Sequence, residues 1–142
     1  MTDRARNSAG ERLSKQAAYY IREHSGQKFS LGKIAGALFV NGSYLSRVFR
    51  RETGYTLLWY HNHVRCEKAK ELLVHTDRGL AEIGSAVGFV SSAHFSHVFR
   101  KMEGCAPSAY RTGSPDRRAA GIRQEDFPSG QEHPDIRKGT DA

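Results

Sequence analysis

Hydrophobic residues recur at helical intervals through most of the first 112 residues, a spacing typical of amphipathic helices. One long segment, 56–76, contains no Gly or Pro, and Thr56 provides an N-cap. Its inward stripe is predicted to comprise Leu58, His61, Arg65, Ala69 and Leu72, with Val64, Cys66 and Leu73 beside it. The pattern predicts one long helix, and the chain before it resembles the chain after it.

Shorter helices are predicted on both sides of this segment. Gly or Pro punctuates the chain between them, and Ser or Thr residues are available as N-caps. The predicted helices span about 10–24, 31–38, 42–53, 80–87, from Ser91 or Ser92 to 103, and 107–111. Residues 1–9 are predicted to form a flexible arm, and 113–142, with three of the four prolines and no periodicity, a disordered tail.

The two pairs of short helices are versions of one unit. LGKIAGAL at 31–38 matches LAEIGSAV at 80–87 with an offset of 49 residues. SRVFRRETG at 46–54 matches SHVFRKMEG at 96–104 with an offset of 50, so the one-residue difference falls in the turn. Two short helices joined by a tight turn predict a helix-turn-helix unit, here repeated. The predicted fold is all-α, with two such subdomains, about 31–54 and 80–104, joined by a long linker helix.

The second helix of each unit is predicted to expose a face suited to the major groove of DNA. At 100° per residue, this face lies opposite the apolar residues. It offers short polar groups and cations that can pair with base edges, and an Ala methyl that can meet a thymine methyl. The predicted base-contacting residues are Ser43, Ser46 and Arg47 in the first unit and Ser92, Ala93, Ser96 and His97 in the second. The predicted phosphate-contacting residues are Arg50, Arg51, Arg100 and Lys101.

Composition supports a polyanionic partner. The net charge is +7, and residues 11–112 carry 15 Lys or Arg against 8 Asp or Glu. Such a field favours nucleic acid or an anionic membrane surface, although a basic face is also often merely solvated. The N-terminus has no secretory signal and no apolar run could span a bilayer, so a cytoplasmic location is expected. Cys66 and Cys105 match no metal spacing and are predicted to be reduced thiols.

Other chemistry finds little support. His94 and His97, or His61 and His63, lack the further ligands that a metal site needs, and His61 is predicted to be a packing residue. No catalytic triad or phosphate-cradling loop is evident, so no enzyme activity, metal or cofactor is expected. The alternative to a sequence-specific DNA binder is a helical protein-interaction module or a nonspecific nucleic-acid binder.

At about residues 10–112 the chain resembles the DNA-binding domain of AraC/XylS-family bacterial transcription regulators. The resemblance is carried by NGSYLSRVFRRETGYT and by VRCEKAKELLVHTDRGLAEIGSAVGFVSSAHFSHVFRKMEGCAPSAYR. It implies seven helices, two recognition helices entering successive major-groove segments of double-stranded DNA, and RNA polymerase as a further partner. The linker helix would be about 30 Å long, close to one DNA turn, and so is predicted to be the spacer between them.

Three residues depart from the pattern of the family. His97 stands where Arg is frequent, His94 where an aromatic residue is frequent, and Gly84 where Ala is common. Gly84 is expected to weaken its helix by up to about 1 kcal/mol. Base reading by the second unit is therefore less strongly indicated than by the first. No segment of the chain is expected to form the effector-binding domain that many family members carry.

Overall fold

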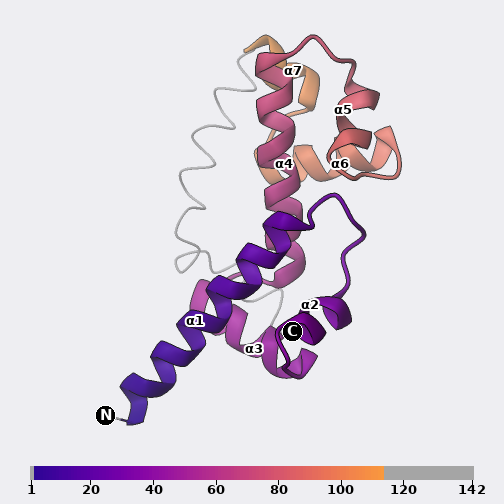
Figure 1. Ribbon diagram of the computed structural model, residues 1–142. Coiled ribbons are helices and arrows are strands. Elements are labelled where there is room, and N and C mark those ends of the chain that lie inside the picture. Colours follow the sequence, from indigo (N-terminus) through magenta and orange to yellow (C-terminus); the bar gives the residue numbers. More distant parts are fainter. Residues whose placement is uncertain (1, 114–142) are drawn as a thin grey trace. The chain divides into compact units, whose positions relative to one another are not determined.

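The computed structural model describes residues 2–113, with side chains from Ala9 onward. The secondary structure of this part of the chain consists of helices without strands, as predicted. Its seven helices are α1 (Thr2–Glu23), α2 (Leu31–Ala37), α3 (Gly42–Thr53), α4 (Leu57–His75), α5 (Leu80–Ala86), α6 (Ser92–Glu103) and α7 (Pro107–Thr112) (Figure 1). The predicted tail lies outside the described residues from 114 onward.

The first helix is longer than predicted. It begins at Thr2, so residues 2–9, expected to be a flexible arm, have a helical backbone. The segment contains no Pro, and its Ala and Arg residues are good helix formers, so the helix extends beyond its predicted start at about residue 10. Gly10, which then lies inside the helix, is buried.

The described residues form two compact units. The first contains residues 2–24 and 29–61, and α1 lies beside α3 within it (Figure 1). Its buried residues include Ala17 and Ile21 of α1 and Leu45, Val48 and Phe49 of α3. The second unit contains residues 25–28 and 62–113, so the sequence of α4 contributes to both units.

The core of the second unit combines α4, α5 and α6. Its buried hydrophobic residues are Cys66, Ala69, Leu73, Ile83, Val87, Phe89, Phe95, Val98 and Phe99. Tyr110 of α7 packs against this cluster, with its ring 5.7 Å from that of Phe99. Cys66 and Cys105 are both fully buried, and neither forms a disulfide. Burial raises the pKa of the Cys66 thiol above its ordinary value.

The inward stripe of α4 differs from the prediction at its first turn. Leu58 is 49% exposed, whereas Leu57 is buried. The buried series runs through Leu57, His61, Arg65, Ala69 and Leu73, in steps of four residues. Because four residues turn a helix by about 400°, this stripe rotates along α4. The predicted straight stripe is therefore wrong at its first turn, since α4 contributes residues to two units. His61 packs edge-on against Phe29, which confirms it as a packing residue.

The two helix-turn-helix units repeat their backbone hydrogen bonds as well as their sequence. Val40 N–H donates to Ala35 O at 3.0 Å, and Phe89 N–H donates to Gly84 O at 2.9 Å. These pairs correspond at the offset of 49 residues seen in the first helices. The extra residue of the second unit is therefore Val90, which follows the conserved geometry of the turn and is 94% exposed. This placement confirms that the one-residue difference lies in the turn.

The recognition helices also end alike. The C-cap Gly54 has φ of 85° and the C-cap Gly104 has φ of 88°, and a glycine adopts this left-handed conformation at little cost. Each cap N–H donates a 2.8 Å hydrogen bond to the carbonyl four residues earlier, in Arg50 and Arg100 respectively. The ends of α3 and α6 are thus set by local chemistry that the sequence repeat carries.

Candidate nucleic-acid interface

The predicted face of α3 lies opposite the core of the first unit. Ser43 and Arg47 are exposed and Ser46 is half-buried, while the apolar positions of the helix are buried. Asn41 caps the helix, because its side-chain oxygen accepts hydrogen bonds from the N–H groups of Ser43 and Tyr44. The cap fixes the start of α3 and so the position of the Ser43 side chain.

The same arrangement recurs on α6. Ser92, Ala93 and His97 are exposed and Ser96 is half-buried. Ser91, not Ser92, is the N-cap, and its hydroxyl oxygen accepts from His94 N–H at 3.0 Å. Ser92 is therefore the first residue of the helix, and its hydroxyl is available to a ligand. His94 is exposed and lies edge-on to Phe89, with ring centroids 5.4 Å apart.

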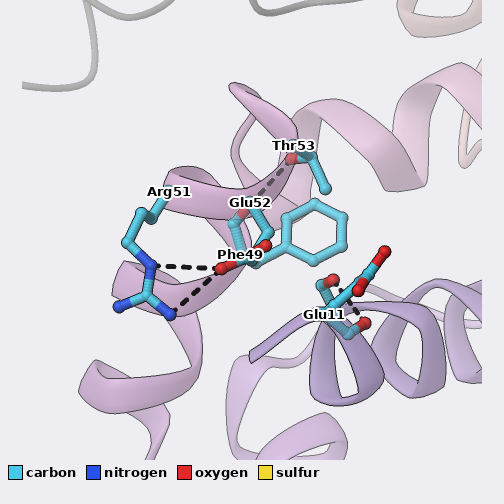
Figure 2. A network of polar contacts seen from close by, with 6 residues as sticks. Glu11, Phe49, Arg51, Glu52 and Thr53 are labelled. Carbon is cyan, nitrogen blue, oxygen red and sulfur yellow. Dashed lines mark hydrogen bonds and ion pairs between the residues drawn. The ribbon is translucent and has the colours of Figure 1, made fainter. Parts of the chain in front are cut away.

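The four cations predicted to contact phosphates lie in different surroundings. Arg100 and Lys101 are exposed on the last turns of α6, and Arg50 is half-buried on α3. Arg51 donates from Nε and Nη2 to Oε2 of Glu52, at 3.2 and 3.1 Å, as Figure 2 shows. Neighbouring residues on a helix do not ordinarily face one another, so the sequence did not predict this pair.

The Arg51–Glu52 pair packs over Gly10 of α1. A Cβ atom at residue 10 would lie 2.5 Å from Nη2 of Arg51 and 2.9 Å from Oε2 of Glu52. The pair is therefore held at the contact between α1 and α3. A phosphate contact by Arg51 would have to compete with Glu52 for the guanidinium group, whereas Arg100 and Lys101 are paired with no carboxylate within the described residues.

Glu103, the acid at the end of α6, is buried. Its Oε1 accepts a hydrogen bond from Nζ of Lys70 in α4 at 3.1 Å. Burial raises the pKa of the Glu103 carboxyl, and the nearby Lys70 ammonium opposes that rise. The sequence indicated only that Glu103 stands at the far end of the exposed face, because the spacing within α6 says nothing about a partner 33 residues away.

The described residues differ in what other kinds of site they could form. Residues 2–113 contain no group of three His, Cys, Asp or Glu side chains arranged to hold a metal ion. None of their helices combines the length and apolarity needed to cross a membrane. A shallow, largely apolar groove of about 380 Å³ lies between α1 and the end of α2, lined in part by Arg12, Lys15 and Tyr19. None of the predicted DNA-contacting residues lines this groove.

Comparison with known proteins decides the family. A model of the helix-turn-helix domain family matches residues 34–113, which include both repeated units except for the first three residues of α2. The chain is 34% identical over 100 residues to the arabinose operon regulatory protein of Escherichia coli K12, covering 70% of this chain and 34% of that protein. The chain belongs to the AraC/XylS family. The predicted resemblance is thereby confirmed, and the family consists of bacterial transcription regulators that bind specific DNA sequences.

Solved structures agree with this assignment to the AraC/XylS family. The C-terminal domain of AraT, a response regulator from Geobacillus stearothermophilus, is 34% identical with a TM-score of 0.68, over 71% of this chain and 84% of that chain. The DNA-binding domain of AdpA, solved in complex with a target DNA, is 26% identical with a TM-score of 0.65, over 75% of this chain and 96% of that chain.

The sequence match covers only part of the length of the curated relatives. The HTH-type regulator YisR of Bacillus subtilis is 36% identical over 104 residues, which is 73% of this chain but 36% of YisR. The chain thus spans about a third of the length of the curated relatives it matches. The AraC/XylS match concerns the helix-turn-helix region of these regulators.

Proposed function

We propose that this chain binds double-stranded DNA by placing α3 and α6 in successive major-groove segments, and that it regulates transcription in the bacterial cytoplasm. The observation that carries the proposal is the repeated face of the two helices. Both present short polar side chains and a basic residue, Arg47 or His97, beside a buried apolar face, at matching positions 50 residues apart. Acids are absent from both sets of exposed positions.

The roles of the residues follow from their positions along each helix. Ser43, Ser46 and Arg47 lie in the first half of α3, the part of a recognition helix that meets base edges. Ser92, Ala93, Ser96 and His97 have the same position in α6. Arg50, Arg51, Arg100 and Lys101 lie farther along and are assigned to phosphates, which set register and supply salt-dependent affinity. Arg51 is the weakest of these assignments because Glu52 engages it.

The first test is selection of binding duplexes from a random-sequence library by the full chain, followed by footprinting. We expect two protected segments about one helical turn apart. A nonspecific binder would yield no enriched sequence, and a random duplex would compete as well as a selected one. A protein-interaction module would lack the steep fall of DNA affinity with salt. Recruitment or obstruction of RNA polymerase is part of the proposal, and no enzymatic step is assigned to the chain.

Arg47→Ala is expected to lower affinity for the selected duplex by about 1–3 kcal/mol and to relax base preference at one position, because Arg pairs with both acceptors of a guanine edge. The measurement is a titration against the selected duplex and its single-base variants. Arg12→Ala, which removes an exposed cation from α1, controls for net charge. Equal weakening on every sequence would reassign Arg47 to phosphate.

His97→Ala is expected to lower affinity for the selected duplex and to relax base preference within the segment assigned to α6, because His97 is exposed on the predicted face of that helix. Affinity is measured at fixed ionic strength for the wild type and for His97→Ala, with His75→Ala, at an exposed position of α4, as the control. Wild-type affinity and base preference in His97→Ala would show that His97 does not approach DNA.

A further inference from the structure

We propose that Glu103 and Lys70 form a positioning pair that fixes the last turn of α6 against α4 and thereby sets how the second unit reads DNA. Neither residue is assigned a contact with DNA. The inference rests on the proposed function, since it concerns the pose of a recognition helix. It adds two residues that act through α6 and were not among the predicted site residues.

Glu103 is buried, Lys70 is half-buried, and the two are in contact. Lys70 Nζ lies 3.1 Å from Glu103 Oε1, and the two side chains are 12% and 2% exposed. Lys70 Nζ also lies 2.7 Å from Oε2 of Glu67 on its own helix and 5.9 Å from the centre of the Tyr110 ring. The ammonium is thus held by groups from α4, α6 and α7. Removing Lys70 would leave the Glu103 carboxylate buried without a charge partner, whereas removing Glu103 would leave Lys70 its contact with Glu67.

The position of Glu103 within α6 supports a tertiary role. Glu103 is the last residue of α6, where the helix dipole disfavours a negative charge. Local helix stability therefore gives no reason for a carboxylate here. Lys70 supplies the compensating charge, and it comes from a different helix. The pair therefore ties the end of α6 to α4 at a site where local preference would select a neutral or basic residue.

The equivalent position in the first unit is used differently. At the offset of 50 residues, Glu103 corresponds to Thr53. The Thr53 hydroxyl donates to Phe49 O at 2.8 Å (Figure 2). It also accepts from Tyr55 N–H at 3.1 Å, so both partners lie within four residues of Thr53. The repeat conserves the face of the recognition helix but not this tether. The charged anchor thus distinguishes α6 from α3.

The experiment uses the full chain and two duplexes: the selected sequence, and the same sequence with the segment assigned to α6 scrambled. The measured quantity is the ratio of the two affinities. Glu103→Gln and Lys70→Met are each expected to reduce this ratio about tenfold, the discrimination carried by about one base pair. The double variant is expected to lose no more than either single variant, because the two residues act as one unit. Lys70→Arg retains the cation and is expected to keep the wild-type ratio.

The controls separate positioning from general damage. Glu71→Gln removes the same charge from an exposed position of α4 and is expected to leave the ratio unchanged. In the DNA-free protein, amide hydrogen exchange in the last turn of α6 is expected to quicken about tenfold in Glu103→Gln. Hydrogen exchange and circular dichroism also identify any variant that does not fold. If Glu103→Gln does not fold, Lys70→Met tests the pair through its other member.

The outcomes distinguish the two proposals. If the wild type discriminates between the duplexes and both Glu103→Gln and Lys70→Met keep its ratio, the positioning pair is wrong while the proposed function stands. If affinity for both duplexes falls equally, in proportion to the folded fraction, the positioning role of the pair is likewise wrong. A wild-type ratio near one would refute the proposed function itself, and the inference with it.

Discussion

Arg65→Met is expected to destabilise the second unit by about 3 kcal/mol or more, a large loss for a single substitution in a domain of this size. Arg65 lies on α4 and is buried. Its Nε donates to Ser25 O at 2.7 Å and its Nη2 to Gln27 O at 2.8 Å. Each is a hydrogen bond from a charged donor, the kind that contributes most to stability. Methionine retains the apolar stem but donates nothing.

The guanidinium group also stacks on the turn of the second helix-turn-helix unit. Its central carbon lies 5.1 Å from the centre of the Phe89 ring. Gly88 leaves room beside it, since a Cβ at residue 88 would lie 3.0 Å from Arg65 Nη2 and 2.9 Å from Gly26 O. Burial lowers the pKa of Arg65, but a guanidinium remains charged throughout the physiological range. One side chain thus holds residues 25–27 and the turn that precedes α6.

Lys68→Met is the matched control for Arg65→Met. Lys68 is exposed and donates from Nζ to the Ser25 hydroxyl at 2.8 Å, so it reaches the same segment from the same helix. Its loss is expected to cost about 1 kcal/mol, less than the loss of Arg65, because one part-buried hydrogen bond is removed and not two made by a buried side chain. Urea unfolding followed by circular dichroism measures both variants. Similar losses of stability in the two variants would mean that the hydrogen bonds of buried Arg65 contribute no more to stability than the contact made by Lys68.

Arg65 and Glu103 have hydrogen-bond partners that the hydrophobic periodicity could not predict. The helices themselves were predictable, because hydrophobic spacing and Gly and Ser punctuation are local features, and six of the seven helices begin and end within about two residues of prediction. Arg65 was assigned to the inward stripe of α4 from its spacing. Its partners, 38 and 40 residues earlier in the chain, leave no trace in that spacing.

The exposed faces of the recognition helices could be predicted because they too follow from local spacing. Once Leu45, Val48 and Phe49 are recognised as the inner face of α3, the outer face follows from helical geometry, and the structure exposes Ser43 and Arg47 accordingly. What each side chain does on that face depends on neighbouring helices. Arg51 bends towards Glu52 where α1 packs against α3, an arrangement that the repeat could not reveal.

Gly84→Ala is expected to destabilise the second unit by about 1–3 kcal/mol, although alanine is the better helix former. The sequence indicated that Gly84 weakens α5, and by helix propensity alone the substitution would be favourable. Gly84, however, is buried against α6. A Cβ there would lie 2.9 Å from Cδ2 of Phe95 and 3.0 Å from its Cβ and Cγ. Phe95 is fully buried, so its ring has no room to move aside.

Gly36→Ala, in the corresponding helix of the first unit, is expected to have the opposite effect on stability. Gly36 is an exposed residue of α2, and a Cβ there would meet no atom within 4 Å. Its substitution should follow helix propensity and stabilise the first unit by up to about 1 kcal/mol. Thermal and urea unfolding of the two variants therefore separate propensity from packing. A gain in stability from Gly84→Ala would contradict the packing explanation.

The repeat itself suggests the compensating change. Gly84 and Phe95 correspond to Ala35 and Leu45, so one unit combines a glycine with a phenylalanine where the other combines an alanine with a leucine. All four residues are buried. The variant Gly84→Ala with Phe95→Leu should thus recover most of the stability that Gly84→Ala loses. Phe95→Leu alone should leave a cavity and lower stability. The coupling free energy between the two substitutions is expected to be about 1–3 kcal/mol, and a value near zero would mean that the two positions do not share their volume.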